Sequence, residues 1–312
     1  MSNVGPRWKL RMHSVLPDIC ACDVADKEAL AAFRRCRSRW YEWLIGNDDH
    51  SISTQITTIV WDDAIFRTIN EARRLATQNY SAERGFNTDL IDLLDRGFVT
   101  SQVMAIRRLI DSGFHDPRRG VISLARLLND VETNQALLTR EHYICFDGTP
   151  YDAPLPERDR AREFTRERMH RTFDRLSGTQ PASRSRTDVV QLSVIESVSK
   201  SLEACGDLRN YANQFIAHAA EPSARRQRVR EQVRITLDAL DSAYRAVVRA
   251  ASFVGLAILF EQSLGEVPQP QYDHLANLDK PMVLPHELDG LHAFWDARVA
   301  EMGNWSENVL PQ

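Results

Sequence analysis

One short stretch, RNYANQFIAHAAEPSARR at residues 209–226, combines residue types that can act on a phosphate group. His218 follows an apolar helical pattern, and a histidine takes up or releases a proton near neutral pH. Arg209 precedes it, Arg225 and Arg226 follow it, and guanidinium groups bind phosphate oxygens. The structural alternative is that His218 ends the helix, where the negative end of the helix dipole favours a cation.

Arg209 lies in an otherwise apolar stripe. The stripe residues recur at three- and four-residue steps: Val198, Leu202, Cys205, Ala212 and Ile216. A charged residue in such a stripe is costly to bury unless it is paired or faces a cavity. Two interpretations therefore stay open. Arg209 faces a partner or a cavity, or its stem packs while its charged end reaches solvent.

The segment ANQFIAHAAE at 212–221 resembles the signature of HEPN domains, which is an arginine, four to six further residues and a histidine. Upstream segments strengthen the resemblance, because they are similar to the abortive-infection-type HEPN proteins of bacteria and occur in the same order. They are WDDAIFRTINEAR (61–73), AIRRLID (105–111), ISLARLLND (122–130) and LTREHYI (138–144).

The resemblance implies a helical, usually dimeric protein that cuts RNA without a metal or other cofactor, at a cleft shared by two subunits. His218 matches the family histidine, and Asn213 matches the polar position after the family arginine. That arginine position is Ala212 here, so Arg209 and Arg225 are the candidates to replace it. On an uninterrupted helix nine residues turn by about 180°, which places Arg209 and His218 on opposite sides. They share a site only if the helix breaks between them or a dimer partner supplies one of them.

Two functions follow from the resemblance. The first is a bacterial defence or toxin-like protein acting as a metal-independent endoribonuclease. In it His218, Asn213 and Arg209 form the catalytic site, and Arg225 and Arg226 bind RNA. The second is a catalytically degenerate HEPN bundle that dimerises and binds RNA or a partner protein, such as an antitoxin, without cleaving. The missing motif arginine favours the second. A purely structural helical protein would explain the helices but not the motif segments.

The overall charge offers no general attraction for nucleic acid, because the formal net charge is -4. Basic residues are local instead: residues 157–186 hold nine arginines against five acidic residues. Arg158, Arg162 and Arg166 recur at four-residue steps along one predicted helical face. Either this face binds phosphate, or it is a solvated face with interspersed acids, and we favour the second interpretation. The segment ARRQRVR at 224–230 stays open, since it adjoins the histidine.

The AIRRLID segment carries two arginines, Arg107 and Arg108, which precede Asp111 by four and three residues. Side chains at these spacings meet on a helix surface. We therefore expect structural ion pairs here rather than a catalytic role.

The cysteines, the N-terminus and the longest apolar run bear on location. Five cysteines, an odd number without a disulfide pattern, favour reduced thiols in a cytoplasmic protein. Residues 1–18 lack the apolar stretch of a signal peptide. The apolar run at 250–260 is about half of the ~20 residues that a membrane span needs, so we expect no membrane span. Cys20 and Cys22 lack the second pair that a zinc site needs, so we expect no metal.

Helical apolar spacing occurs nearly everywhere, and strand-like alternation is almost absent. We therefore expect an all-α bundle built on long antiparallel helices. The two longest are expected at 187–218 and 224–262, joined by the short turn AAEPS. The other helices are expected at 26–44, 53–78, 87–111, 123–139, 157–176 and 286–301.

A Pro-rich stretch, residues 265–285, divides the chain. We expect a HEPN-like bundle domain at 1–264 and a C-terminal extension with a final helix at 265–312. Trp295 and Trp305 suggest that this extension packs as an arm across the neighbouring subunit of a homodimer.

Overall fold

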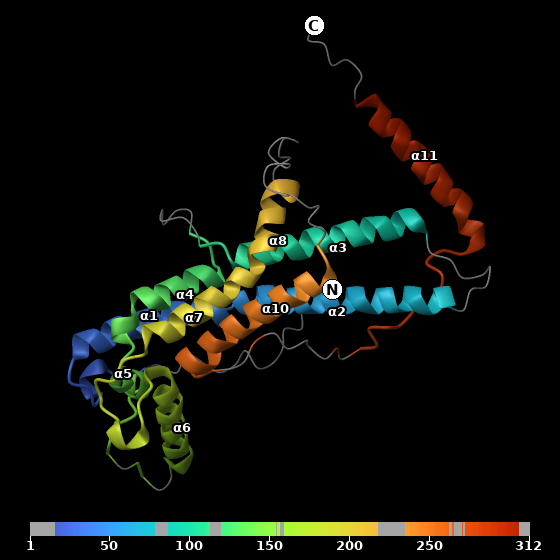
Figure 1. Ribbon diagram of the computed structural model, residues 1–312. Coiled ribbons are helices and arrows are strands. Elements are labelled where there is room, and N and C mark those ends of the chain that lie inside the picture. The colour runs from blue at the N-terminus through green and yellow to red at the C-terminus, as the bar shows by residue number, and fades with distance from the viewer. Residues whose placement is uncertain are drawn as a thin grey trace. The chain divides into compact units, whose positions relative to one another are not determined.

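The fold is helical. The computed structural model describes residues 16–78, 87–112, 120–153, 155–156, 159–217, 235–261, 264, 270 and 272–305. Within these ranges Figure 1 shows helices and connecting segments, and the β-structure is one isolated antiparallel bridge between Thr139 and Val189. The prediction of an all-α helical bundle is therefore confirmed for the described part of the chain.

The α-helices of the described residues carry the labels of Figure 1. They are α1 (Lys27–Ile45), α2 (Ile52–Gln78), α3 (Thr88–Leu109), α4 (Leu124–Thr133), α5 (Arg140–Cys145), α6 (Arg160–Ser177), α7 (Leu192–Ser201), α8 (Gly206–Tyr211), α10 (Leu237–Ser252) and α11 (Leu288–Asn304). Several begin at a side chain that accepts a hydrogen bond from a backbone N–H of the first turn, which stabilises a helix start. These capping residues are Asp26, Asn87, Ser123, Thr139 and Thr236.

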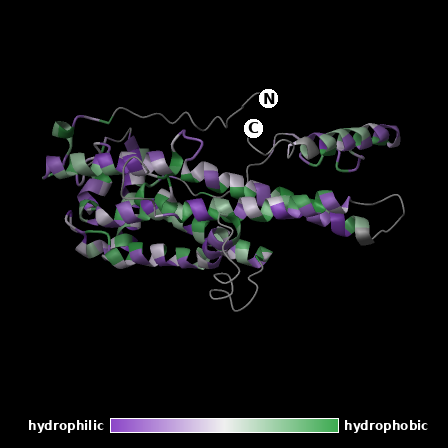
Figure 2. Cartoon of the chain, turned by 90° about the horizontal axis from the view of Figure 1, so that it is seen from above, coloured by the Kyte–Doolittle hydropathy of each residue, from purple (hydrophilic) through white to green (hydrophobic). Residues whose placement is uncertain are grey.

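The chain forms two compact units, Met1–Val267 and Pro268–Gln312. The first unit has a continuous apolar core. Helix α1 contributes Phe33, Trp40 and Leu44, which lie at helical spacing and are at most 1% exposed. In Figure 2 hydrophobic and hydrophilic residues alternate along the helices, as expected for helices with one buried face.

The second unit contains α11, and many of its large apolar side chains are exposed. Phe294 is 71% exposed and Trp295 is 67% exposed. The hypothesis that this extension packs across a neighbouring subunit stays a prediction.

The prediction of one helix over 187–218 is wrong. Residues 187–191 are not helical, and α7 ends at Ser201. A 3-10 turn at Leu202–Cys205, the short helix α8 and a π turn at Ala212–Ile216 follow. Serine, cysteine and glycine are weak helix formers, and they concentrate where the regular helix gives way.

The expected helix over 224–262 is also wrong as a single element. Residues 235–236 are not helical, and the Thr236 side chain caps α10 by accepting from the N–H of Ala239. The helix then changes to a π turn at Phe253–Ile258. Residues 218–234, including the expected AAEPS turn, lie outside the described residues.

The helix expected over 123–139 is divided as well. Helix α4 ends at Thr133, a 3-10 turn spans Gln135–Leu137, and α5 starts after Thr139. The cause is local: the Thr139 hydroxyl accepts from the N–H of His142, which starts a new helix in a different direction.

No helix in the described ranges is both long enough and apolar enough to pass through a bilayer.

Candidate functional site

A cleft of about 580 Å³ lies where the C-terminal end of α3 meets α4 and the run of helical turns from α7 to the π turn. Helix α8 packs on α3, and α4 packs on α7. Figure 1 shows α8 crossing α3 near its C-terminal end, with α4 and α7 alongside. Three separate parts of the sequence therefore build one concave surface.

One face of the α7–α8 run lines this cleft. The lining residues recur at three- and four-residue steps: Ser199, Glu203, Gly206, Arg209 and Asn213. The structure thus brings two sequence-predicted site residues, Arg209 and Asn213, together on the same wall, and both are exposed. The opposite face of α8 is the buried one. Leu208 is 1% exposed and Ala212 is 0% exposed.

Arg209 lines the cleft and its side chain is exposed, which fits both interpretations of this residue. Leu208, one residue earlier, fills the apolar step that Arg209 was expected to interrupt. Ala212, which the resemblance aligns with the motif arginine, faces the core rather than the cleft.

The facing walls come from α3 and α4. Arg107 and Asp111 lie at the end of α3, and Asn129 and Glu132 lie on α4. Helix α4 is fixed by its other side, because a carboxylate oxygen of Asp130 accepts hydrogen bonds from Trp40 and Arg39 of α1, both at 2.6 Å. This anchor turns the neighbouring residues of α4 towards the cleft.

Four charged side chains of the cleft are not neutralised within the described residues. Arg107 and Arg209 form no ion pair with any described residue, and neither do Glu132 and Glu203. Most other arginines of the described ranges bind a carboxylate or a backbone carbonyl, for example Arg67, which is 2.7 Å from Asp241. A few polar groups that converge on one concave surface are the usual pattern of a binding site.

The ion pairs expected for Arg107 and Arg108 with Asp111 are absent from the described residues. The reason is that α3 ends at Leu109 with Ile110 as its C-cap. Asp111 lies beyond the helix, so the i, i+4 geometry does not reach it. Arg107 is left facing the cleft instead.

A π turn lies inside the motif segment. The N–H of Ala217 donates to the carbonyl of Ala212 at 2.8 Å, a five-residue step in place of four. A π turn adds about one residue to a helical turn and is frequent at functional sites. The step to Ala217 is therefore rotated by about 100° relative to a regular α-helix. His218 lies outside the described residues, so the expected placement of Arg209 and His218 on opposite sides stays a prediction.

Three of the segments on which the expected resemblance rests line the cleft. AIRRLID supplies Arg107 and Asp111, ISLARLLND supplies Asn129, and ANQFIAHAAE supplies Asn213. These segments are far apart in the sequence, and the fold brings them to one surface. The other predicted site residues, His218, Arg225 and Arg226, lie outside the described residues.

Several residues of the cleft were not expected from the sequence. Glu132, Glu203 and Gly206 were not singled out as site residues, and Arg107 was assigned to ion pairing. A signal was present for two of them, since Glu203 and Gly206 share the helical face that contains Arg209.

No family model, no curated protein and no solved structure matches this chain. The functional interpretation therefore rests on the site itself.

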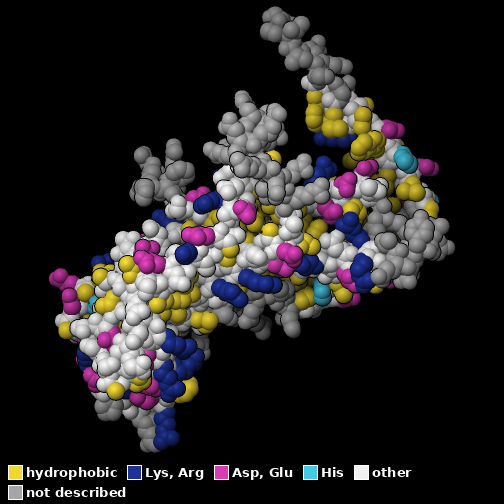
Figure 3. Space-filling view, viewed as in Figure 1, with side chains coloured by type: hydrophobic (Ala, Val, Ile, Leu, Met, Phe, Trp, Pro, Cys, Tyr) yellow, Lys and Arg dark blue, Asp and Glu magenta, His cyan; other side chains and the backbone are white. Residues whose placement is uncertain are grey.

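The arginine-rich stretch at 157–186 is occupied by contacts within the chain. Arg162 donates to the Thr149 hydroxyl, and Arg166 pairs with Glu163 at 2.7 Å and donates to the carbonyl of Pro150. On the face shown in Figure 3, Lys and Arg side chains lie in small groups with Asp and Glu between them. These contacts support the interpretation as a structural, solvated helix face.

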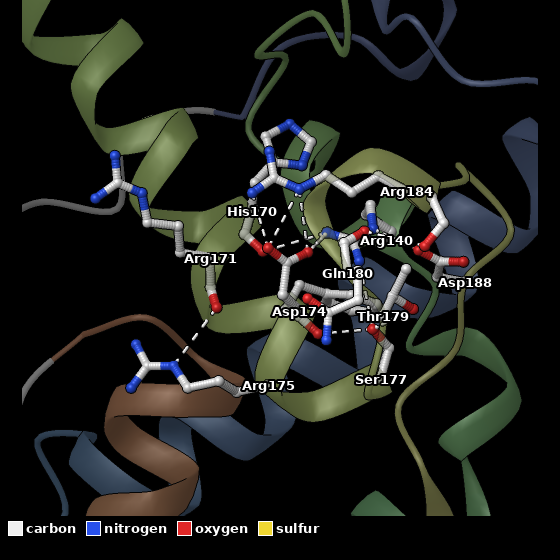
Figure 4. Close-up of polar contacts among 12 residues, drawn as sticks. Arg140, His170, Arg171, Asp174, Arg175, Ser177, Thr179, Gln180, Arg184 and Asp188 are labelled. Atoms are coloured by element: carbon white, nitrogen blue, oxygen red, sulfur yellow. Dashed lines mark hydrogen bonds and ion pairs between the residues drawn. The ribbon is translucent and has the colours of Figure 1, made fainter.

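A buried polar cluster lies around Arg140, which is 0% exposed. Its guanidinium is 2.7 Å from Asp174 and 2.8 Å from Asp188. Figure 4 shows Arg140 between these two carboxylates, with Arg184 also reaching Asp174. The cluster ties α5 to α6 and to the segment before α7. Its charges pair with one another inside the chain, so we assign it a structural role.

His170 belongs to the same region and is 8% exposed. Its Nδ1 has no hydrogen-bond partner among the described residues. The pKa of His170 is lowered from 6.5 to about 4, first by burial and then by the positive charges of Arg184 and Arg140. The folded state therefore keeps this side chain neutral at pH values where the unfolded chain binds a proton.

This shift makes stability depend on pH. Because the unfolded state binds more protons between about pH 4 and 6.5, the free energy of unfolding falls as the pH drops through this window. The side chain of the His170→Phe variant cannot titrate. Between pH 7 and about pH 4.5 we therefore expect the free energy of unfolding of this variant to fall by about 2 kcal/mol less than that of the wild type. Urea denaturation at the two pH values measures this. Equal losses in both proteins would contradict the assignment to His170.

No group of three or more His, Cys, Asp or Glu side chains in the described ranges is arranged to hold a metal ion.

Proposed function

We propose that this chain is a HEPN-type protein of the bacterial defence or toxin class that cleaves RNA without a metal, at the cleft between α3, α4 and α8. The observation that carries the proposal is the convergence of the three HEPN-like segments on that cleft. Arg209 and Asn213 line it together, and Arg107, which forms no ion pair with a described residue, adds a second cation.

The proposed reaction is the attack of a ribose 2'-OH on the adjacent phosphate. The 2'-oxygen forms a bond to phosphorus, and the 5'-oxygen of the next nucleotide leaves with a proton. His218 would take the proton from the attacking 2'-OH and pass it to the leaving 5'-oxygen. Arg209 would stabilise the negative charge on the phosphoryl oxygens. Asn213 would position the substrate, and Arg225 and Arg226 would bind the RNA backbone. A homodimer in the cytoplasm completes the proposal. All five cysteines are free, which suits a reducing compartment.

A second candidate function is binding without cleavage, to RNA or to a partner protein such as an antitoxin. Two observations favour it. The position of the motif arginine is Ala212 in the core, and the cleft also carries three carboxylates, at Asp111, Glu132 and Glu203. Carboxylates repel phosphate, so they weaken the case for phosphoryl chemistry.

A cleavage assay in EDTA separates the two functions. We expect the wild type to cleave single-stranded RNA and His218→Ala to be slower by about 10²–10⁴-fold, because general acid–base catalysis contributes about that much. Light scattering on the same samples gives the oligomeric state. A folded dimer that binds RNA but does not cut it would favour the second function.

A further inference from the structure

Gly206 lies in the cleft wall, between Glu203 and Arg209. Its backbone is ordinary right-handed helix, with φ of -58° and ψ of -44°. A Cβ placed on it would meet no atom within 4 Å. Neither the backbone conformation nor a neighbouring atom therefore requires glycine, although glycine weakens a helix relative to alanine. Unlike Gly97, which is equally open but lies outside the cleft, Gly206 offers a bare backbone to a ligand in the cleft.

The charged groups on both sides of Gly206 limit what that ligand is. Glu203 lies on the same helical face, and Glu132 lies on the facing wall from α4. Both lack a partner among the described residues. An ionised carboxylate only accepts hydrogen bonds, so it repels a phosphate and binds a group that donates.

In RNA such donors are the ribose 2'-OH, which every nucleotide carries, and groups on the bases, which differ from base to base. Guanine is the base that presents two adjacent donors on one edge, N1–H and N2–H₂, and these match the two oxygens of a single carboxylate. That edge is accessible only when the base is unpaired. The cleft volume, about 580 Å³, lies within the range of about 300–1,000 Å³ found for small-molecule sites.

We propose that the cleft recognises an unpaired guanine of single-stranded RNA. The base lies against the backbone at Gly206, Glu203 accepts from N1–H and N2–H₂, and Glu132 lines the opposite side. Arg107 and Arg209 then bind the flanking phosphates. This inference rests on the proposed RNA-binding function and assigns its substrate preference.

The first test is a binding measurement by fluorescence anisotropy in EDTA. The probes are short oligouridine RNAs with one central guanosine, inosine, adenosine or uridine. Inosine lacks only the N2 amino group. We expect the guanosine RNA to bind tighter than the others by on the order of tenfold, and Glu203→Gln to remove that preference. Glu196→Gln, a change at an exposed acid of α7 outside the cleft, should keep the preference.

The second test uses Gly206 and a matched glycine. Gly97, in α3, would also have no atom within 4 Å of an added Cβ, and it does not line the cleft. Gly206→Ala and Gly97→Ala should each raise the Tm by about 1–4 °C, because alanine favours the helix. Gly206→Ala should nevertheless weaken guanosine RNA binding, and Gly206→Leu should weaken it further, whereas Gly97→Ala and Gly97→Leu should not.

The outcomes separate this inference from the proposed function. Equal binding of all four RNAs, or an unchanged preference in Glu203→Gln, would overturn the guanine assignment and leave RNA binding intact. If the folded wild type bound none of the RNAs, the guanine assignment and the proposed RNA-binding function would both be overturned.

Discussion

Replacing Arg140 with alanine is expected to lower the free energy of unfolding by about 3–5 kcal/mol, the usual cost of removing one partner from a buried ion pair. Arg140 is fully buried, and its guanidinium binds Asp174 and Asp188 as well as the carbonyl of His170. Without it two largely buried carboxylates lose a partner, and α6 loses one of its ties to the segment before α7. Urea denaturation at pH 7 measures the loss.

The matched control is Arg171→Ala on the same helix α6. Arg171 pairs with Glu167 at 3.1 Å, but its side chain is 65% exposed. Exposed pairs contribute little, so the control should change the free energy of unfolding by less than about 1 kcal/mol. A loss from Arg140→Ala as small as that of the control would contradict the structural role assigned to the cluster.

The same cluster predicts how this penalty changes with pH. Burial raises the pKa of Asp174, but hydrogen bonds from Arg184 and Arg140 outweigh it and bring the pKa below 3.8. The stabilisation from this carboxylate is present above pH 3.8 and is lost as the pH falls through the lowered pKa. The difference between the wild type and Arg140→Ala should therefore narrow at low pH, because a protonated Asp174 no longer needs the arginine.

Arg209→Ala is expected to slow metal-free RNA cleavage by about 10²–10³-fold, the effect of removing one group that stabilises charge in the transition state. Arg209 is the cleft arginine nearest in sequence to Asn213 and the π turn, and it forms no ion pair with a described residue. Single-turnover rates on a labelled single-stranded RNA measure the effect. The fold should be unchanged, because the side chain is exposed.

Arg245→Ala is the control for this variant. Arg245 is an exposed arginine of α10 that forms no ion pair with a described residue and does not line the cleft. The Arg245→Ala substitution removes the same charge from outside the cleft. The cleavage rate should therefore stay within about twofold of the wild-type rate. Equal losses in Arg209→Ala and Arg245→Ala would mean that general charge, rather than the cleft, determines the rate.

Strong apolar periodicity with a capping residue made some helices predictable from the sequence. For α1, α2 and α3 the predicted and observed ends differ by at most two residues. The prediction failed for 187–218, because apolar spacing continues smoothly through 3-10 and π turns and does not reveal them. The divided helices also depended on capping side chains at Thr139 and Thr236.

Only the wall of the cleft formed by the run from α7 to the π turn was predictable from the sequence. Arg209 and Asn213 were singled out, because the motif resemblance and the stripe both pointed to them. Arg107 and Glu132 come from other helices, and no local pattern shows that they face Arg209. The position of Glu132 depends on how α4 is anchored to α1 through Asp130, a contact between residues far apart in the sequence.

The most direct test of the central claim is the chemistry of the product ends. Purified protein is incubated in EDTA with a single-stranded RNA, and with the same RNA in which the ribose at each cleaved position is 2'-deoxy. Metal-independent attack by the 2'-OH predicts products with a 2',3'-cyclic phosphate and a 5'-OH, and no cleavage at the deoxy positions. Products with a 3'-OH and a 5'-phosphate, cleavage at the deoxy positions, or no cleavage of any RNA would contradict the proposal.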